Sequence, residues 1–512
     1  MSSIVQTLDR VESNDRLPST GNGRVLPAAE RASLLAALSE FLPADAVLFD
    51  REDLKPYECD GLSAYKQLPA IVVLPRNEEE VRRTLGLCSA RNVPVVARGA
   101  GTGLSGGALP HGAGVLMSLA RFMRILETDP LARTARVQPG VRNLAISEAA
   151  APHGLYYAPD PSSQIACTIG GNVAENSGGV HCLKYGLTVH NILRLRMCTS
   201  EGEMVEIGAD ALDSAGYDLL ALMTGSEGLL GVVTEVTVKL LPKPETARCV
   251  LAAFDSITAA GNAVADVIAA GIIPAGLEMM DKQATAAVEP FVHAGYPLDA
   301  EAILLCESDG TAAEVEAEIG RVNEVMRAAG AYEVRVSRDE AEQLRFWSGR
   351  KAAFPAVGRI SPDYYCMDGT IPRKRLAEVL AGIGALERKY ELRCANVFHA
   401  GDGNLHPLIL YDANAPGELE RCEAFGAEIL ELCVEAGGTI TGEHGVGVEK
   451  IDQMCIQFPP KVLAAFHAVK SAFDPAGILN PGKAVPTLHR CAELGRMHVH
   501  GGQEKHPELP RF

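Results

Sequence analysis

The sequence predicts an α+β protein with more than one domain. A strand–helix–strand unit within residues 70–98 runs into a glycine-rich loop, and two more such units lie within residues 249–336. This second pair predicts a small antiparallel sheet with helices on one face. With 512 residues, of which 47% are hydrophobic and 22% charged, the chain can form two or more globular domains.

A glycine-rich loop, residues 99–107, is the centre of the first unit. Residues 28–42 have the apolar spacing of an amphipathic helix, residues 70–75 read as a strand, and Asn77 is the N-cap of the next helix. The strand at 95–98 then enters the loop, which has five glycines in nine residues. Glycine permits close approach to the backbone, and successive free N–H groups bind anions. The loop therefore predicts a pyrophosphate site.

Residues 101–106 also match the dinucleotide motif GxGxxG. That motif needs a helix opening directly after it. Here Pro110 and two further glycines follow, and residues 115–119 read as another strand. We therefore reject a Rossmann site. An ordinary glycine-rich turn is the structural alternative for this stretch.

A second region rich in glycine and asparagine lies at residues 159–179. We expect it to form a long loop whose backbone approaches a ligand closely. A strand at 134–138 and a helix at 142–151 precede it. A hairpin at 193–207 and a strand at 232–241 follow. Pro242 and Pro244 come next and mark a domain boundary.

The second half of the chain repeats simpler units, which predict a domain that covers a substrate. Its expected strands are residues 249–254, 277–280, 302–307, 332–336, 395–399 and 408–411. Its expected helices are residues 255–270, 313–329, 376–386 and 418–436. Residues beyond 489 form a polar tail with His498, His500 and His506, for which a solvated end is expected.

Charge and cysteine content exclude several functions. The net charge of −18 argues against binding to nucleic acid or to an anionic lipid surface. The thirteen cysteines contain no CxxC pair and no ferredoxin spacing, so we expect a reducing cytosol and no iron–sulfur cluster in this chain. Residues 1–24 lack the apolar core of a signal peptide. The most apolar region, 264–280, is too interrupted for a transmembrane helix.

Two histidines, His399 and His406, flank a Gly-Asp-Gly-Asn turn, and Glu443-His444-Gly445 follows later in the chain. Two imidazoles and a carboxylate suit a divalent transition metal with open positions for substrate. The alternative is a pair of structural histidines. The Glu-His-Gly motif between further glycines is harder to explain by packing, so the pattern favours a metal site.

These motifs together resemble FAD-linked 2-hydroxy-acid dehydrogenases, which are vanillyl-alcohol-oxidase-like flavoproteins. The resemblance rests on the first loop, Gly170–Asn172, the 225–232 loop, the histidine motifs and Asn480-Pro481-Gly482-Lys483, and it extends from about residue 15 into the tail. It implies a helical segment at 1–49 and a two-lobed PCMH-type FAD-binding domain at 50–242. A ferredoxin-like α+β cap at 243–415, a C-terminal helical segment at 416–488 that completes the flavin site, and the tail at 489–512 would follow.

The resemblance also implies which residues bind FAD. They are Arg98, Gly99, Ala100, Gly101, Thr102, Gly103, Leu104, Ser105, Pro159, Asp160, Gly170, Gly171, Asn172, Asn176, Gly178, Gly179, Glu227, Gly228, Val232 and Asn480. Family members with covalent flavin carry a histidine in the first loop. This loop has none, so we expect non-covalent FAD.

The implied reaction is oxidation of glycolate to glyoxylate, with hydride passing from the substrate Cα to flavin N5. By resemblance, His399, His406 and Glu443 bind a divalent metal (Zn, Mn or Fe), and His444 is the base. Arg350 binds the substrate carboxylate, and Lys351, Tyr364 and Tyr365 are weaker candidates for this role. The structural alternative for Arg350 is a surface cation on a helix. Where relatives acting on 2-hydroxyglutarate carry polar groups, this chain has Phe354, Cys366 and Leu408, which suggests a small apolar pocket.

The resemblance implies that electrons leave through an iron–sulfur subunit and a second FAD-binding-type subunit to a quinone pool. The chain would then be cytoplasmic and peripheral at the inner membrane, associated only through those partners. Three alternatives stay open: a dehydrogenase of D-lactate or another D-2-hydroxy acid, a flavin-dependent transferase, and a non-catalytic FAD-binding subunit.

Overall fold

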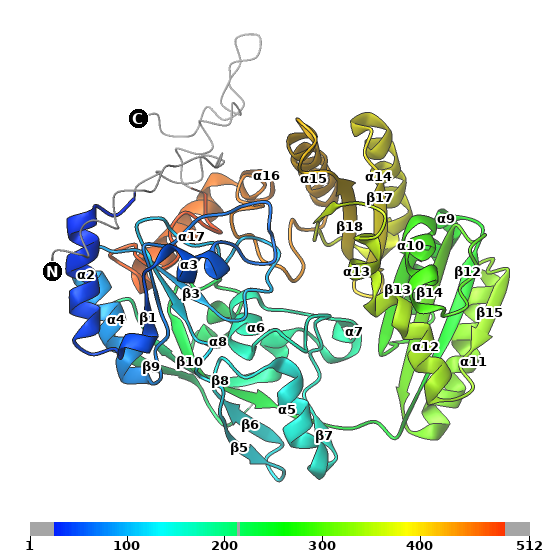
Figure 1. Ribbon diagram of the computed structural model, residues 1–512. Helices are drawn as coiled ribbons and strands as arrows, with labels where there is room; N and C mark the ends of the chain where they lie inside the picture. Colours follow the sequence, from blue (N-terminus) through cyan, green and yellow to red (C-terminus); the bar gives the residue numbers. More distant parts are fainter. Residues whose placement is uncertain (1–24, 212–215, 487–512) are drawn as a thin grey trace.

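The computed structural model describes residues 25–211 and 216–486 and confirms the α+β class. Figure 1 shows two bodies side by side. The first body contains the described residues up to 242 together with residues 474–486. The second body contains residues 246–435. A linking segment, residues 437–473, packs against the hydrophobic cores of both.

The first lobe of the first body is a four-stranded sheet in the order β1-β2-β4-β3. The strands are β1 (Val47–Leu48), β2 (Ile71–Val73), β3 (Val95–Arg98) and β4 (Val115–Ser118), and helices α2 (Ala28–Ser39), α3 (Arg51–Leu54) and α4 (Glu78–Ala90) accompany them. Asn77 caps α4 as expected, because its side chain accepts a hydrogen bond from the Glu80 N–H. The chain returns at Leu479, which bridges to Val95 beside β3.

The second lobe is an antiparallel five-stranded sheet in the order β5-β6-β10-β8-β9. Its strands are β5 (Ile125–Asp129), β6 (Thr134–Val137), β8 (Ile192–Cys198), β9 (Met204–Gly208) and β10 (Val232–Lys239), with β7 (Leu155–Tyr156) pairing separately with β11 (Leu241–Pro242). The helices are α5 (Asn143–Ala150), α6 (Ile169–Glu175), α7 (Cys182–Tyr185) and α8 (Leu219–Met223). The expectation of a long loop at 159–179 was wrong in part, because residues Ile169–Glu175 form α6. Ile169 and Val173 are buried, and their packing supports α6 despite its two glycines.

The second body is an antiparallel seven-stranded sheet in the order β15-β12-β14-β13-β17-β18-β16. Its strands are β12 (Thr246–Phe254), β13 (Gly276–Asp281), β14 (Ala302–Gly310), β15 (Glu333–Val336), β16 (Asp363–Cys366), β17 (Cys394–His399) and β18 (Asn404–Tyr411). Its helices are α9 (Ile257–Ala269), α10 (Lys282–Val292), α11 (Ala312–Ala328), α12 (Glu340–Lys351), α13 (Ala353–Val357), α14 (Leu376–Tyr390) and α15 (Glu418–Glu435).

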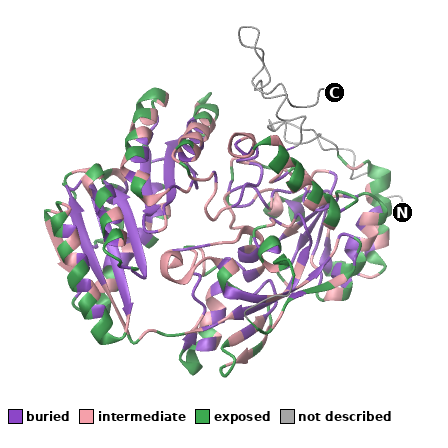
Figure 2. Cartoon of the chain, turned by 180° about the vertical axis from the view of Figure 1, so that it is seen from behind, coloured by how far each residue is buried: buried purple, intermediate pink, exposed green. Residues whose placement is uncertain are grey.

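Helices cover both faces of this sheet, so the expectation of one covered face was wrong. On β12, Val250 and Phe254 join a core with α9, α11, α14 and α15, whereas Leu251 and Ala253 join a core with α10, α12 and α13. Figure 2 shows the inner strands of this sheet as largely buried, and every residue of β13, β17 and β18 is buried. A continuous apolar strand, rather than an alternating one, is the sequence signature of burial on both faces.

The linking segment carries α16 (Met454–Gln457) and α17 (Pro460–Phe473) back to the first body. Ile440 and Ile451 are buried in the core of the second body, and Phe473 packs against the second lobe of the first. Among the described helices, none is both long and apolar enough to cross a membrane.

Candidate active site

A cavity of about 400 Å³ is lined by residues of both bodies and the linking segment. The first body contributes the glycine-rich loop, the first turns of α6 and residues 226–233. The second body contributes the end of α12 and the two histidines of β17 and β18. Glu443 and His444 complete the lining from the linking segment.

Most of the residues expected to bind FAD lie together in this lining. They are Arg98, Gly99, Ala100, Gly101, Thr102, Gly103, Leu104, Gly170, Gly171, Asn172, Glu227, Gly228 and Val232. The remaining seven are not part of the lining: Ser105, Pro159, Asp160, Asn176, Gly178, Gly179 and Asn480. Of these, Asp160 accepts a hydrogen bond from His181, and Asn480 donates to the carbonyls of Gly107 and Glu227 at 2.9 and 2.7 Å.

The lining leaves room and polar groups for a diphosphate-containing cofactor. Gly101 has φ +72°, and a Cβ at Gly99 would overlap the Thr168 hydroxyl, so side chains are excluded where the backbone is closest to the cavity. Among the described residues, none offers a hydrogen bond to the buried Thr168 hydroxyl or to the Asn172 side-chain amide. Buried polar groups normally have partners, so these atoms fit FAD.

Burial shifts the pKa values of two ionisable residues near the glycine-rich loop, Lys483 and Glu175. Burial lowers the pKa of Lys483 to about 7, although Asp60 and Glu227 oppose the shift. Its ammonium donates to the Gly107 carbonyl at 2.9 Å. Burial, reinforced by Glu227, raises the pKa of Glu175 well above its usual value. Burial therefore reduces both the positive charge of Lys483 and the negative charge of Glu175 at this end of the cavity.

The expected metal ligands form a compact group. The Nε2 atoms of His406 and His399 lie 2.9 and 3.3 Å from the same Glu443 oxygen, and the donor atoms of all three residues lie within 4.8 Å of one another. The His399 and His406 rings are nearly perpendicular, at 85°. Both Nε2 atoms therefore converge from different directions, which suits one cation.

The outer ring nitrogens are held by further groups. His399 Nδ1 lies 2.7 Å from the Glu278 carboxylate, and His406 Nδ1 lies 3.3 Å from the Met367 carbonyl. A metal-bound histidine usually donates its other N–H in this way. Although burial opposes it, the carboxylates of Glu278 and Glu443 raise the pKa of His399 well above its usual value, and the same negative field attracts a cation.

Arg350 is buried, so the surface-cation interpretation of it was wrong. Its Nε donates to Glu278 Oε2 at 2.5 Å, and its Nη2 lies 3.4 Å from His399 Nδ1. Glu278 thus joins the predicted carboxylate-binding residue to a predicted metal ligand. Lys351 also lines the cavity but is exposed.

Asp368, which follows β16, holds the loop that carries Glu443 and His444. Its Oδ2 accepts from the N–H groups of Gly442 and His444 at 3.1 and 2.9 Å and from the Thr441 hydroxyl at 2.6 Å. The fully buried Lys450 lies 3.2 Å away. Although burial opposes ionisation, His444 and Lys450 hold the pKa of Asp368 well below its usual value.

The same loop is held from the first body by Glu227. Its two carboxylate oxygens each accept one hydrogen bond, from the N–H groups of Val446 and Gly447, both at 2.7 Å. Glu227 was expected to bind FAD. In the structure it lines the cavity and also fixes the linking segment.

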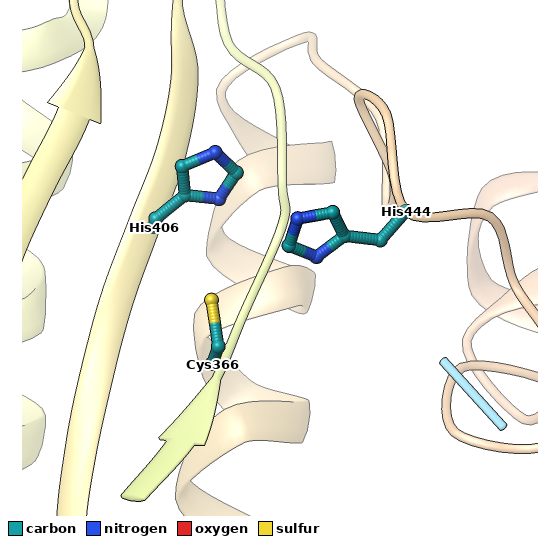
Figure 3. A group of neighbouring side chains, drawn as sticks. All are labelled: Cys366, His406 and His444. Carbon is teal, nitrogen blue, oxygen red and sulfur yellow. The ribbon is translucent and has the colours of Figure 1, made fainter. Parts of the chain in front are cut away.

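His444 lies against His406, with the ring centroids 4.9 Å apart and the planes inclined by 7°. Burial lowers the pKa of His444 to about 4, despite the nearby Asp368. Its imidazole is therefore neutral near pH 7 and can accept a proton. Figure 3 shows it beside His406 and the thiol of Cys366.

Two details of the expected substrate pocket need correction. Leu408 is fully buried in a core of the second body, so it cannot form a pocket wall. Cys366 is also buried, and its thiol approaches His406 and His444 instead. Phe354 does line the cavity. Tyr364 packs edge-on against Phe354, and Tyr365 is buried.

Sequence reasoning missed Glu278, Asp368 and Lys450. Glu278 lies in the apolar stretch 264–280, where it counted only as an interruption that argues against a transmembrane helix. A charged residue in a continuous apolar strand was the available signal, because such residues are rarely buried without partners. Asp368 and Lys450 carried no comparable signal.

Comparison with known proteins agrees with this geometry. Residues 69–208 match the family described as "FAD binding domain", and residues 243–484 match "FAD linked oxidases, C-terminal domain". The fold and cavity define the protein as an FAD-linked oxidoreductase. The chain belongs to the FAD-linked oxidase family.

Two relatives are similar to this chain in sequence, and one solved structure is similar to it in fold. Glycolate oxidase subunit GlcD of Escherichia coli (strain K12) is 65% identical over 95% of this chain and 98% of its own length. A D-lactate dehydrogenase of Anaerostipes hadrus is 34% identical over 85% of this chain and 94% of its own. The structure of p-cresol methylhydroxylase with substrate bound superposes with a TM-score of 0.77 at 17% identity, covering 91% of this chain and 98% of that one.

Proposed function

We propose that this protein is the catalytic subunit of a glycolate oxidase, which oxidises glycolate to glyoxylate using FAD. The observation that carries the proposal is the group formed in the cavity lining by the buried His399 and His406 and the half-buried Glu443 and His444. The 65% identity to a glycolate oxidase subunit supports the choice of substrate. D-Lactate is the second candidate, because a D-lactate dehydrogenase matches most of the chain.

Arg350 and Lys351 bind the substrate carboxylate in this proposal. Charged hydrogen bonds contribute about 1.5–3 kcal/mol, and Arg can bind a carboxylate through two of them. Glu278 fixes the Arg350 guanidinium by its contact with Nε, Nη2 lies 3.4 Å from His399 Nδ1, and Nη1 is the terminal nitrogen that we assign to the substrate. The replacement Arg350→Met should therefore weaken substrate binding far more than FAD binding.

His444 takes the proton from the substrate hydroxyl. Its neutral state follows from burial, and Asp368 fixes its backbone. His399, His406 and Glu443 would hold a divalent transition metal, which when bound supplies a Lewis acid that lowers the pKa of a hydroxyl. The glycine-rich loop, α6 and residues 226–233 would hold FAD non-covalently, and the bound flavin supplies the acceptor for two electrons.

Phe354 restricts the substrate to a small one, since it lines the cavity beside Arg350 and Lys351. A second carboxylate, as in 2-hydroxyglutarate, would be left unpaired near this ring, which is costly. We therefore expect poor turnover of 2-hydroxyglutarate. Comparable rates with 2-hydroxyglutarate and glycolate would contradict this specificity.

The relatives named as glycolate oxidase subunits support a multi-subunit enzyme. We propose that an iron–sulfur subunit and a second FAD-binding-type subunit take the electrons to quinone, and that they bring this cytoplasmic chain to the inner membrane. The chain alone should then react slowly with oxygen. Rapid peroxide formation by the purified chain would contradict this route.

A flavin-dependent transferase and a non-catalytic FAD-binding subunit remain rival proposals. The latter has no need of a buried metal-ligand group with a neutral histidine beside it. A transferase of the ether-lipid type would need a long apolar tunnel, whereas charged side chains, among them Arg350, Lys351 and Glu443, stand in the lining of this cavity.

The test is an anaerobic titration of the FAD-loaded protein with glycolate, D-lactate and 2-hydroxyglutarate, followed by the absorption of oxidised flavin. We expect glycolate to bleach the band, chelation to abolish the bleaching, and a divalent ion to restore it. His444→Gln should not bleach, whereas the control His467→Gln, whose histidine contacts the Pro486 carbonyl, should. A band that stays oxidised with every acid, in protein holding FAD and metal, would refute the proposal.

A further inference from the structure

We propose that Cys366, His406 and His444 form a second metal site, which binds a thiophilic cation such as Cd²⁺ and thereby inhibits the enzyme. The sulfur and one nitrogen of each histidine all lie within 4.8 Å of one another. Figure 3 shows the three side chains converging from β16, β18 and the linking segment. Thiolate and imidazole together select softer cations than a set containing a carboxylate.

Two of the three ligands are buried, the third, His444, is half-buried at the cavity, and the site has an unused donor atom. Cys366 is 4% and His406 2% exposed. Among the described residues, none offers a hydrogen bond to the buried Nδ1 of His444. Such an atom in a native structure calls for an explanation, and a cation supplies one. Binding as a thiolate releases the Cys366 proton to water.

The ion requires a small rearrangement of His444. A tetrahedral site with bonds of about 2.0–2.3 Å has edges of about 3.3–3.8 Å, so the three donors must draw closer. The His406 and His444 planes differ by only 7°, and one ring must turn for both in-plane lone pairs to meet one ion. His444 is the ring that turns, because within the described part of the chain its Nδ1 makes no hydrogen bond that the turn would break.

An ion bound at this second site prevents an ion from binding at the first site, formed by His399, His406 and Glu443. A neutral imidazole has one unprotonated nitrogen, so His406 binds one ion at a time. It cannot serve the group with His399 and Glu443 and the group with Cys366 and His444 together. An ion on His444 also occupies the lone pair that accepts the substrate proton. Binding itself is independent of the proposed reaction, and only the inhibition rests on it.

The experiment uses FAD-loaded protein stripped of metal and then loaded with ¹¹³Cd²⁺. The cadmium NMR shift distinguishes thiolate from nitrogen and oxygen ligands. We expect a thiolate-bound signal in the wild type that is lost in Cys366→Ser. The matched control is Cys306→Ser, which alters a fully buried cysteine of β14 and should keep the signal. In parallel, Cd²⁺ should inhibit Mn²⁺-supported glycolate oxidation about tenfold more weakly in Cys366→Ser than in the control.

Two results would overturn the proposal. One is cadmium bound to wild type through nitrogen and oxygen ligands alone. The other is a thiolate signal that Cys366→Ser leaves unchanged. If the protein fails to oxidise glycolate, the NMR comparison still decides whether the site exists, so failure of the proposed function is a separate outcome.

Discussion

Replacing Asp368 by Asn should strongly reduce the catalytic rate, although Asp368 does not itself line the cavity. The Asp368 Oδ2 accepts hydrogen bonds from the backbone of Gly442 and His444 and from the Thr441 hydroxyl. Asn offers one carbonyl oxygen and places an NH₂ group among these donors. The replacement therefore loses charged hydrogen bonds and introduces a donor–donor contact in the loop that carries Glu443 and His444.

The size of the expected loss in stability and rate follows from the burial of the Asp368–Lys450 ion pair. Lys450 and Asp368 have fully buried side chains, and removing one partner of such a pair costs about 3–5 kcal/mol. Glu449, at 3.4 Å, offsets part of that cost. A displacement of about 1 Å at catalytic groups can cost about 100-fold in rate. We therefore expect kcat for glycolate to fall about 100-fold, with a smaller change in KM and reduced metal content.

The assay combines steady-state kinetics with an artificial electron acceptor, metal analysis and thermal unfolding. Asp363→Asn is the matched control, because Asp363 lies on β16, just before Asp368, and its side chain accepts a hydrogen bond from the Ala413 N–H. The double variant Asp368→Asn/Lys450→Met tests how much of the stability loss comes from the buried cation, because in the single variant the ammonium keeps Glu449 as its ion-pair partner. Wild-type kcat and metal content in a folded Asp368→Asn variant would refute this reasoning.

Three further predictions concern other contacts. Glu278→Gln should raise KM for glycolate and lower metal affinity about 10–100-fold, because Glu278 holds both Arg350 and His399. Steady-state kinetics and metal titration test this, and an unchanged KM together with an unchanged metal affinity would contradict it. Removing metal should abolish substrate-dependent bleaching but leave FAD bound, since the glycine-rich loop and the histidines are separate parts of the lining; loss of FAD on chelation, measured by filtration, would show otherwise. His181→Gln should lower the Tm more at about pH 6 than at high pH. Although burial opposes it, Asp160 and Glu307 raise the pKa of His181, so its stabilisation is present below the unfolded pKa and lost as pH rises through the elevated one. A Tm difference that does not vary with pH would exclude this contribution.

Local patterns predicted much of the fold and much of the cavity lining. The glycine-rich loop, the Asn77 cap and the hairpin at 193–207 are set by short-range turn and capping preferences, and the structure confirms them. Helix α6 was missed because its glycines weaken helix propensity, while the burial of Ile169 and Val173 depends on distant strands. Tertiary packing routinely overrides propensity in this way.

The supporting residues of the candidate site could not be found from spacing. His399 and His406 are close in sequence, and Glu443 stood out through its neighbours. Asp368 acts only through contacts more than seventy residues away along the chain, and no periodicity encodes such contacts. The covering of both sheet faces was missed because α10, α12 and α13, which pack on the second face, were not among the predicted helices.

The return of the chain to its first body has a consequence for biosynthesis. Asn480 donates to the Gly107 carbonyl across 373 positions of sequence, and Leu479 bridges to Val95 at the edge of the first sheet. At about 5–20 residues per second, the ribosome needs about 20–75 s to deliver these partners after the glycine-rich loop has emerged. During that time a strand edge remains open to wrong pairing. The nascent chain must therefore be shielded before it can hold its cofactor, and translation speed through the second body sets how long that shielding lasts.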